Sequence, residues 1–86
     1  MTNLSRRLID VSDRFAELTG ISRTQQSYQI FRDQRRLDRV ATATVDLRLS
    51  SFEGAMRWLS EKWPDGAAWP EGIERPVAAP AEGEAA

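Results

Sequence analysis

The sequence predicts a small all-α domain of about four helices, followed by a short tail that does not fold. Apolar residues recur at helical spacing in the first and last stretches of the 86-residue chain. Only residues 42–49 alternate loosely like a strand, and one short strand cannot form a sheet alone. The length suits a single domain.

The first helix is predicted over about residues 3–19. Apolar side chains stand at spacings of four, three, four and three residues, which places them on one helix face: Leu4, Leu8, Val11, Phe15 and Leu18. Asn3 or Thr2 can cap its start, and Gly20 is a suitable stop at its C-terminal end.

A second helix is predicted to begin just after Ser22, whose hydroxyl is a good N-cap. Residues 23–31 are mostly polar, and their apolar members Tyr28, Ile30 and Phe31 gather at the C-terminal end. We therefore expect few core contacts and a polar face left free for another role.

The remaining elements follow from similar signals. Residues 32–43 should continue helically after a break near Asp33, and residues 42–49 should form a loop. The last helix should start at a capping box with Ser50 as N-cap and Glu53 at N3, and end at Pro64. The predicted core is Leu4, Leu8, Val11, Phe15, Leu18, Ile21, Tyr28, Phe31, Leu37, Val40, Leu49, Phe52, Met56, Leu59 and Trp63.

The composition argues against several classes of protein. Without Cys or His, the chain has no ligands for a zinc finger or iron–sulfur cluster, no thiol nucleophile and no His base. No glycine-rich phosphate loop is present, and Asp10 and Asp13 are best interpreted as a solvated surface pair. We expect no catalytic residue, metal or cofactor. No membrane span or signal peptide is evident, which favours a cytoplasmic protein.

Charge is unevenly distributed along the chain. Residues 1–63 hold eleven basic and eight acidic side chains, a net +3, whereas residues 64–86 have a net charge of -4. Residues 76–86 are rich in Ala, Pro, Glu and Gly, so we expect a domain over 1–75 and a disordered acidic tail over 76–86. Eleven of the twelve basic residues are Arg, which suits contacts to phosphate and guanine but also reflects GC-rich genomes.

The first two helices carry the signals of a helix–turn–helix. Ala16 supplies a small residue where the helices cross, Gly20 permits a tight turn and Ile21 can fill it. The stretch FAELTGISR, residues 15–23, resembles the turn region of the lambda-repressor-like family of phage and bacterial regulators. TQQS, residues 24–27, resembles the Gln-rich recognition helices of lambdoid phage repressors, and DLRLSSFEGAMRWL, residues 46–59, resembles the helix that closes that fold.

The resemblance extends over about residues 4–63 and has departures. Trp63-Pro64 is similar to the end of the last helix in short prophage-type proteins, but the family's usual first helix is missing. An ungapped match puts the two apolar positions of the recognition helix on Gln26 and Gln29. A turn two residues longer puts them on Tyr28 and Phe31, and we favour this register because it suits a core better.

The resemblance implies that helix 23–31 enters the major groove of double-stranded DNA. Gln25 and Gln26 would contact adenine, Arg23 would contact guanine or phosphate, and the arginines that follow the helix would clamp phosphates. The candidate DNA-binding residues are Arg23, Thr24, Gln25, Gln26, Ser27, Gln29, Arg32, Arg35, Arg36 and Arg39.

These features predict a sequence-specific transcriptional regulator of phage or prophage type that binds DNA as a homodimer. We expect Trp58 and Trp69 to be exposed in a monomer, so a second subunit would cover at least one of them. Two alternatives remain open. The arginines can pair with Asp33 and Asp38 on an ordinary surface. The chain can also be a protein-binding inhibitor or adaptor that acts through its three tryptophans.

Overall fold

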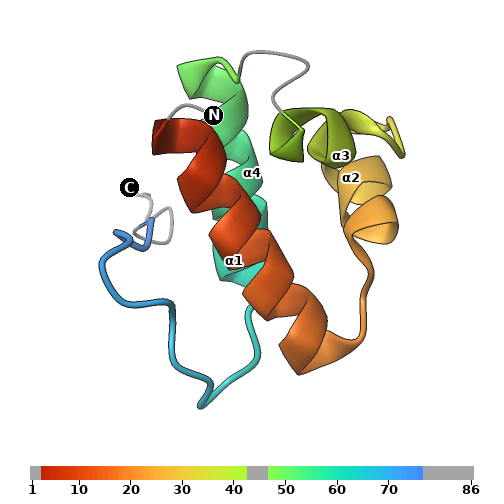
Figure 1. Cartoon of the computed structure of the whole chain (residues 1–86). Coiled ribbons are helices and arrows are strands. Elements are labelled where there is room, and N and C mark those ends of the chain that lie inside the picture. The colour runs from red at the N-terminus through yellow and green to blue at the C-terminus, as the bar shows by residue number, and fades with distance from the viewer. Residues whose placement is uncertain (1–2, 43–46, 77–86) are drawn as a thin grey trace, which may run out of the picture.

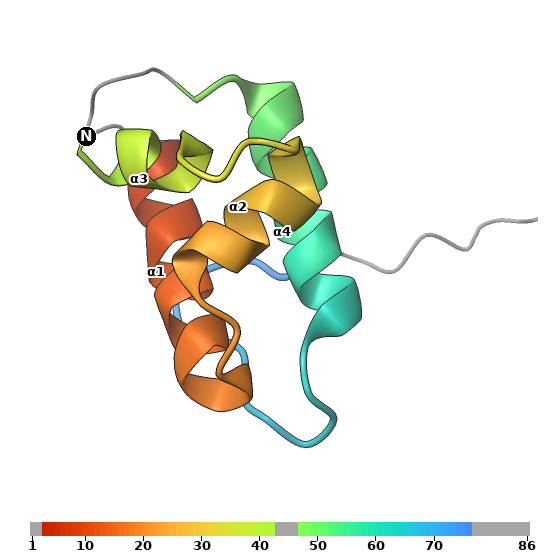
Figure 2. The same ribbon diagram turned by 90° about the vertical axis from the view of Figure 1, so that its right-hand side faces the viewer.

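The computed structural model describes residues 3–42 and 47–76 and contains four helices in this part of the chain. They are α1 (Asn3–Thr19), α2 (Arg23–Phe31), α3 (Arg36–Ala41) and α4 (Leu49–Lys62), and the described residues include no strand. The predicted all-α class is confirmed. In Figures 1 and 2, α1 and α4 lie side by side, α2 and α3 cover one side of this pair, and residues 64–76 run back along the opposite side.

The core forms where α1 faces α4 and α3. Leu8 and Val11 of α1 are fully buried against partners that include Leu37 of α3 and Leu59 of α4. The three- and four-residue spacing in α1 explains this burial, because it keeps the apolar side chains on the face that packs. The predicted bounds of the first helix are confirmed.

A three-residue turn connects α1 to α2. Gly20 has a φ of 78°, in the left-handed region that favours glycine, and its N–H donates to the carbonyl of Ala16 at 2.8 Å. Ser22 is the N-cap of α2, as predicted. Gly20 therefore ends α1 and Ser22 caps α2, with Ile21 as the one residue between them.

The non-helical segment between α2 and α3 is longer than the short break near Asp33 that the sequence suggested, because α2 ends at Phe31 and α3 begins at Arg36. Arg32, the C-cap of α2, has a φ of 58°, which directs the chain away from the helix axis. The Asp33 carboxylate then accepts the N–H of Arg35 at 2.9 Å, before α3 begins at Arg36. Residues 43–46 lie outside the described residues, as does the expected tail beyond Pro76.

The predicted capping box of the last helix is wrong. α4 begins at Leu49 with Arg48 as its N-cap, and no side chain caps it. The carbonyl of Arg48 accepts the N–H of Phe52 at 2.9 Å. The helical hydrogen bonds therefore begin two residues earlier than they would if Ser50 were the N-cap. Leu49, expected in the core, is 59% exposed on the first turn.

The tryptophans pack within one chain. Trp63 is buried, and the distance between the ring centroids of Trp63 and Trp69 is 4.7 Å. Trp58 meets Phe15 edge-on at 5.6 Å. Trp58 and Trp69 are both half-buried, so the expectation that they are exposed in a single chain is wrong, while their cover by a second subunit stays a prediction. The physical reason is that Trp58 packs on Phe15 of α1, while residues 64–76 fold back and bring Trp69 onto Trp63.

Candidate nucleic-acid interface

The outward face of α2 is a stripe of side chains that runs from its first turn to its C-cap. The stripe residues are exposed and follow the four-residue spacing of one helix face: Thr24, Gln25, Tyr28, Gln29 and Arg32. In Figure 2, α2 crosses in front of α1 and α4, so this helix lies on the outside of the molecule. The part of the chain that the structure describes therefore leaves the stripe open to a partner.

Gln25 has a local role at the start of α2. Its backbone N–H donates to Ser22 Oγ at 3.2 Å, and its Oε1 accepts the N–H of Ser22 at 3.0 Å. These two bonds form a capping box, which the sequence analysis did not assign to this pair. The Gln25 amide group keeps Nε2 for a ligand, but a bidentate contact to adenine would require the cap to open.

Gln26 is fully buried, which corrects the expected register. Its Oε1 accepts from Ser12 Oγ at 2.6 Å, and its Nε2 donates to the carbonyls of Ser12 at 3.1 Å and Ile21 at 3.0 Å. The short turn places Gln26 inward, as in the ungapped match, while Tyr28 is 44% exposed. Gln29, which the ungapped match also placed inward, is exposed. The Gln26 amide is therefore occupied inside the protein and does not reach a ligand.

Ser27 is also fully buried and connects α2 to α3. Its Oγ donates to the carbonyl of Asp33 and accepts the N–H of Leu37 at 3.0 Å. The hydroxyl thus satisfies backbone groups on both sides of the break between the helices. Like Gln26, it holds the site in place and has no exposed surface with which to contact DNA.

Arg23 joins three helices through its guanidinium group. It forms ion pairs with Asp13 of α1 at 2.7 Å and Asp38 of α3 at 3.3 Å. The hydrogen bond with Asp13 raises the pKa of Arg23 above its ordinary value, against the effect of partial burial. Because both its partners are carboxylates, Arg23 positions α2 and is not a free contact for guanine.

Arg32 and Arg35 keep guanidinium groups that form no ion pair among the described residues. Arg32 lies over the ring of Tyr28, with 5.5 Å from its Cζ to the ring centroid. Both side chains are exposed. They are the most available cations of this surface, Arg32 within the stripe and Arg35 beside it.

Arg36 and Arg39 are more restricted. Arg36 packs over Phe31 at 5.1 Å, and its Nε is buried with no hydrogen-bond partner in residues 3–42 and 47–76. Arg39 pairs with Asp33 at 3.0 Å. The pKa of Asp33 is lowered, first by the backbone N–H of Arg35 and then by the charge of Arg39. Asp33 thus pairs with Arg39, as the alternative interpretation of this surface expected, whereas Asp38 pairs with Arg23 of α2.

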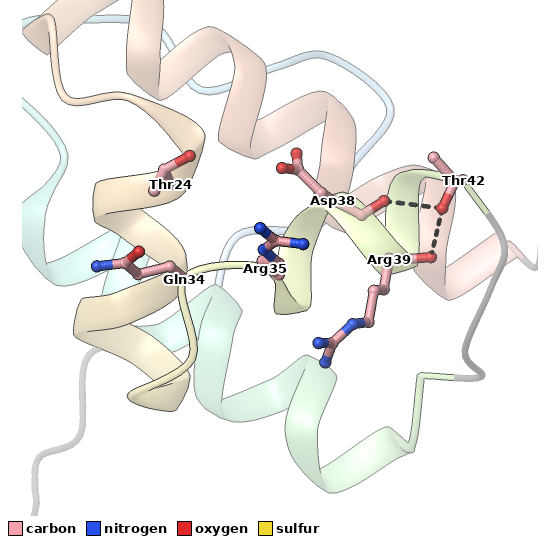
Figure 3. A pocket seen from close by; sticks show the side chains of 6 residues that line it. All are labelled: Thr24, Gln34, Arg35, Asp38, Arg39 and Thr42. Atoms are coloured by element: carbon pink, nitrogen blue, oxygen red, sulfur yellow. Dashed lines mark hydrogen bonds between the residues drawn. The ribbon is translucent and has the colours of Figure 1, made fainter.

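A shallow open pocket of about 540 Å³ lies between α2 and α3. Figure 3 shows Thr24 reaching it from α2, whereas the other lining side chains come from α3, its C-cap and the two residues before the helix. Thr42 Oγ1 donates to the carbonyls of Asp38 and Arg39 at 3.0 and 3.2 Å. The pocket is lined by Thr24, Gln34, Arg35, Asp38, Arg39 and Thr42.

The sequence analysis missed three of these lining residues, Gln34, Asp38 and Thr42. The only sequence feature that could have indicated Gln34 as a lining residue is its position next to Arg35. Asp38 and Thr42 are one helical turn apart, and that spacing would have placed them on one face of a helix beginning at Arg36. Over residues 20–42, five arginines and two aspartates give a net +3 in a chain whose total is -1.

Comparison with known proteins adds no further assignment: no family model, curated protein or solved structure matches the chain. None of the four helices is long and apolar enough to cross a membrane. Among the residues that the structure describes, no group of three acidic side chains is arranged to hold a metal ion. The function must therefore be argued from the surface around α2.

Proposed function

We propose that this chain binds double-stranded DNA, with the α2 stripe in the major groove and nearby arginines on the phosphates. In this role it would act as a transcriptional regulator of phage or prophage type. The observation that carries the proposal is the exposed α2 stripe together with Arg32 and Arg35, which form no ion pair among the described residues, in a segment of net +3. Positive charge concentrated around one exposed helix is the electrostatic pattern of a nucleic-acid-binding surface.

The geometry of α1 and α2 supports the proposal. A three-residue turn that contains Gly20 joins the helices, as in helix–turn–helix units. An α-helix with its side chains is about 10–12 Å in diameter, so the nine-residue α2 fits a groove about 12 Å wide. The buried amide of Gln26 and the ion pairs of Arg23 hold α2 on α1, which keeps the stripe in a defined orientation.

Base contacts are assigned to the exposed residues of α2. Gln29 has a side-chain amide with no hydrogen bond in the described part of the protein, so both its groups can pair with adenine. Thr24 offers a hydroxyl and a methyl group, and Tyr28 offers a ring edge to thymine methyl groups. Gln26 and Ser27 are withdrawn from the expected set because they are buried.

Phosphate contacts are assigned to Arg32, Arg35 and Arg39. Within residues 3–42 and 47–76, Arg32 and Arg35 pair with no carboxylate, and Arg39 forms an ion pair with Asp33. Arg36 is left out because its guanidinium packs on Phe31. A single short helix buries little surface, so we also propose that two copies bind together on DNA.

Fluorescence anisotropy with random duplexes and with a duplex selected from them tests the proposal. With three arginines on phosphates, the slope of log K against log salt should be about -3 per protomer. Gln29→Ala should lose about 1–3 kcal/mol on the selected duplex and little on random DNA. Arg35→Ala should weaken binding to both and reduce the slope by about 1.

Arg57→Ala is the matched control for Arg35→Ala. Arg57 is an exposed arginine of α4 and lines a separate hollow with Ile73, on the side of the molecule away from α3. Its loss changes net charge equally but should leave affinity nearly unchanged. Equal effects of the two arginine variants, or no duplex binding at low salt, would contradict the proposal.

A further inference from the structure

Trp58 differs from the other two tryptophans in what its indole N–H does. Trp63 Nε1 donates to the carbonyl of Ala67 at 3.2 Å, and Trp69 Nε1 donates to that of Ile73 at 2.9 Å. Trp58 Nε1 has no hydrogen-bond partner among the described residues and is reached by solvent. Of the three tryptophans, Trp58 is therefore the one whose indole donor is not used by any described residue and is available to another molecule.

The Trp58 side chain lines a groove of about 400 Å³ between the C-terminal half of α1, α2 and the C-terminal half of α4. Trp58 and Ile21 are half-buried in the groove, and Phe15 lies beneath them. Thr19 lines the groove too, but its hydroxyl already bonds the carbonyl of Phe15 and the N–H of Ile21. We call this site the α1–α2–α4 groove; its floor is aromatic and aliphatic.

The rim of the groove carries donors and one cation. Lys62 has no ion pair among the described residues, Gln29 has a free side-chain amide, and Gln25 keeps its Nε2. No carboxylate from the described part of the chain lines the groove. Its chemistry is therefore complementary to an apolar group that is accompanied by carbonyl oxygens and a negative charge.

We infer that the α1–α2–α4 groove binds a protein partner through an acidic peptide segment with one aromatic or large aliphatic anchor. The anchor would pack on Trp58 and Ile21, a peptide carbonyl would accept from Trp58 Nε1, and a carboxylate would pair with Lys62. A tryptophan that combines apolar area with a free donor is the residue type most enriched in such contacts. The groove is open to solvent, which suits a crossing peptide better than an enclosed small molecule.

Occupation of the groove would also affect DNA binding. Gln25 and Gln29 belong to both the groove rim and the α2 stripe. A peptide in the groove would lie against the side chains assigned to base contacts, so peptide and duplex should compete. This second statement rests on the proposed function, whereas binding in the groove does not.

Nuclear magnetic resonance of the ¹⁵N-labelled full chain tests the groove without DNA. The probes are two acetylated, amidated peptides with a central Phe, flanked in one by Glu and in the other by Lys. The Glu peptide should shift the Trp58 indole resonance, while those of Trp63 and Trp69 serve as internal references that do not move. No shift at millimolar peptide, equal shifts of all three indoles, or equal effects of both peptides would overturn the inference.

Two variants separate binding from folding. Lys62→Glu should weaken the Glu peptide by about threefold or more, since it replaces attraction with repulsion. Arg57→Glu makes the same charge change outside the groove and should have little effect. Trp58→Phe keeps an aromatic ring against Phe15 but removes the donor, and should weaken binding by about three- to tenfold. Equal losses in the two charge variants would show that net charge, not the groove, attracts the peptide.

Competition is measured separately by adding the Glu peptide to a protein–duplex complex. Displacement that Lys62→Glu reduces would support the coupling. Binding of the peptide in the groove with no displacement would refute the coupling alone. If no duplex binds at all, the proposed function fails, while the indole shifts still decide whether the groove takes the peptide.

Discussion

Gln26→Ala removes the amide that joins α1 to α2 in the core. Three hydrogen bonds are lost, two to carbonyl groups and one to Ser12 Oγ. At a net contribution of about 0.5–1.5 kcal/mol each, with a further cost for the cavity left in a fully buried site, the free energy of unfolding should fall by about 3 kcal/mol or more. A chain of this size has a stability of only about 4–13 kcal/mol, so this is a large fraction.

Urea and thermal denaturation followed by circular dichroism measure this loss. The melting temperature should fall by at least about 12 °C, since each kcal/mol corresponds to about 4–8 °C in a domain of this size. Gln29→Ala is the matched control, because it removes the same side chain from the exposed side of the same helix. Its effect should stay within about 0.5 kcal/mol.

Similar losses for the two glutamine variants would refute the buried position of Gln26 and with it the orientation of the α2 stripe. If Gln26→Ala does not fold, Gln26→Met preserves most of the volume and isolates the hydrogen bonds. A double-mutant cycle of Gln26→Met with Ser12→Ala should then give a coupling of about 1 kcal/mol. A coupling near zero would show that the two side chains do not meet.

Three further predictions concern single residues. Gly20→Ala should destabilise the protein by about 1 kcal/mol because φ is positive. Gly54→Ala, in the exposed interior of α4, should stabilise it by about 0.5–1 kcal/mol. Changes of the same sign in urea denaturation of the two variants would contradict this prediction. The lowered pKa of Asp33 contributes stability above the ordinary Asp pKa, which is lost as the pH falls below about 4, so Asp33→Asn should flatten this acid limb in denaturation at several pH values. Arg75→Ala removes two hydrogen bonds to Ser60 and the cation over Trp69, so acrylamide should quench tryptophan fluorescence more strongly than in the unmodified protein.

The parts of the fold that were predictable are those where apolar spacing or a backbone constraint determines the outcome. Helix α1 is strongly amphipathic, and Gly20 followed by Ser22 marks both the end of one helix and the start of the next. The start of α4 was not predictable from Ser50 and Glu53, because a capping-box pattern also occurs inside the first turn of a helix that has already begun.

The candidate site was only partly predictable for a different reason. The identity of a polar residue does not show whether its side chain is buried or exposed. Gln26 and Gln29 are therefore equivalent in the sequence, but Gln26 is buried and Gln29 is exposed in the structure. Gln26 can be buried because Ser12 of α1 supplies a hydroxyl that donates to its amide oxygen. Likewise, whether an arginine remains free depends on distant carboxylates, as Arg23 and Asp13 show.

The polar attachment of α2 has a consequence for how the protein opens. α1 packs mainly on α4, through apolar side chains, whereas the fully buried residues of α2 are Gln26 and Ser27. Hydrogen bonds of this kind contribute little until their partners are in position, so we expect α1 and α4 to associate first during folding and α2 to join late. Backbone amides of α2 should then exchange with solvent through local opening while those of α1 remain protected, and the helix that faces the partner would adjust without unfolding the rest.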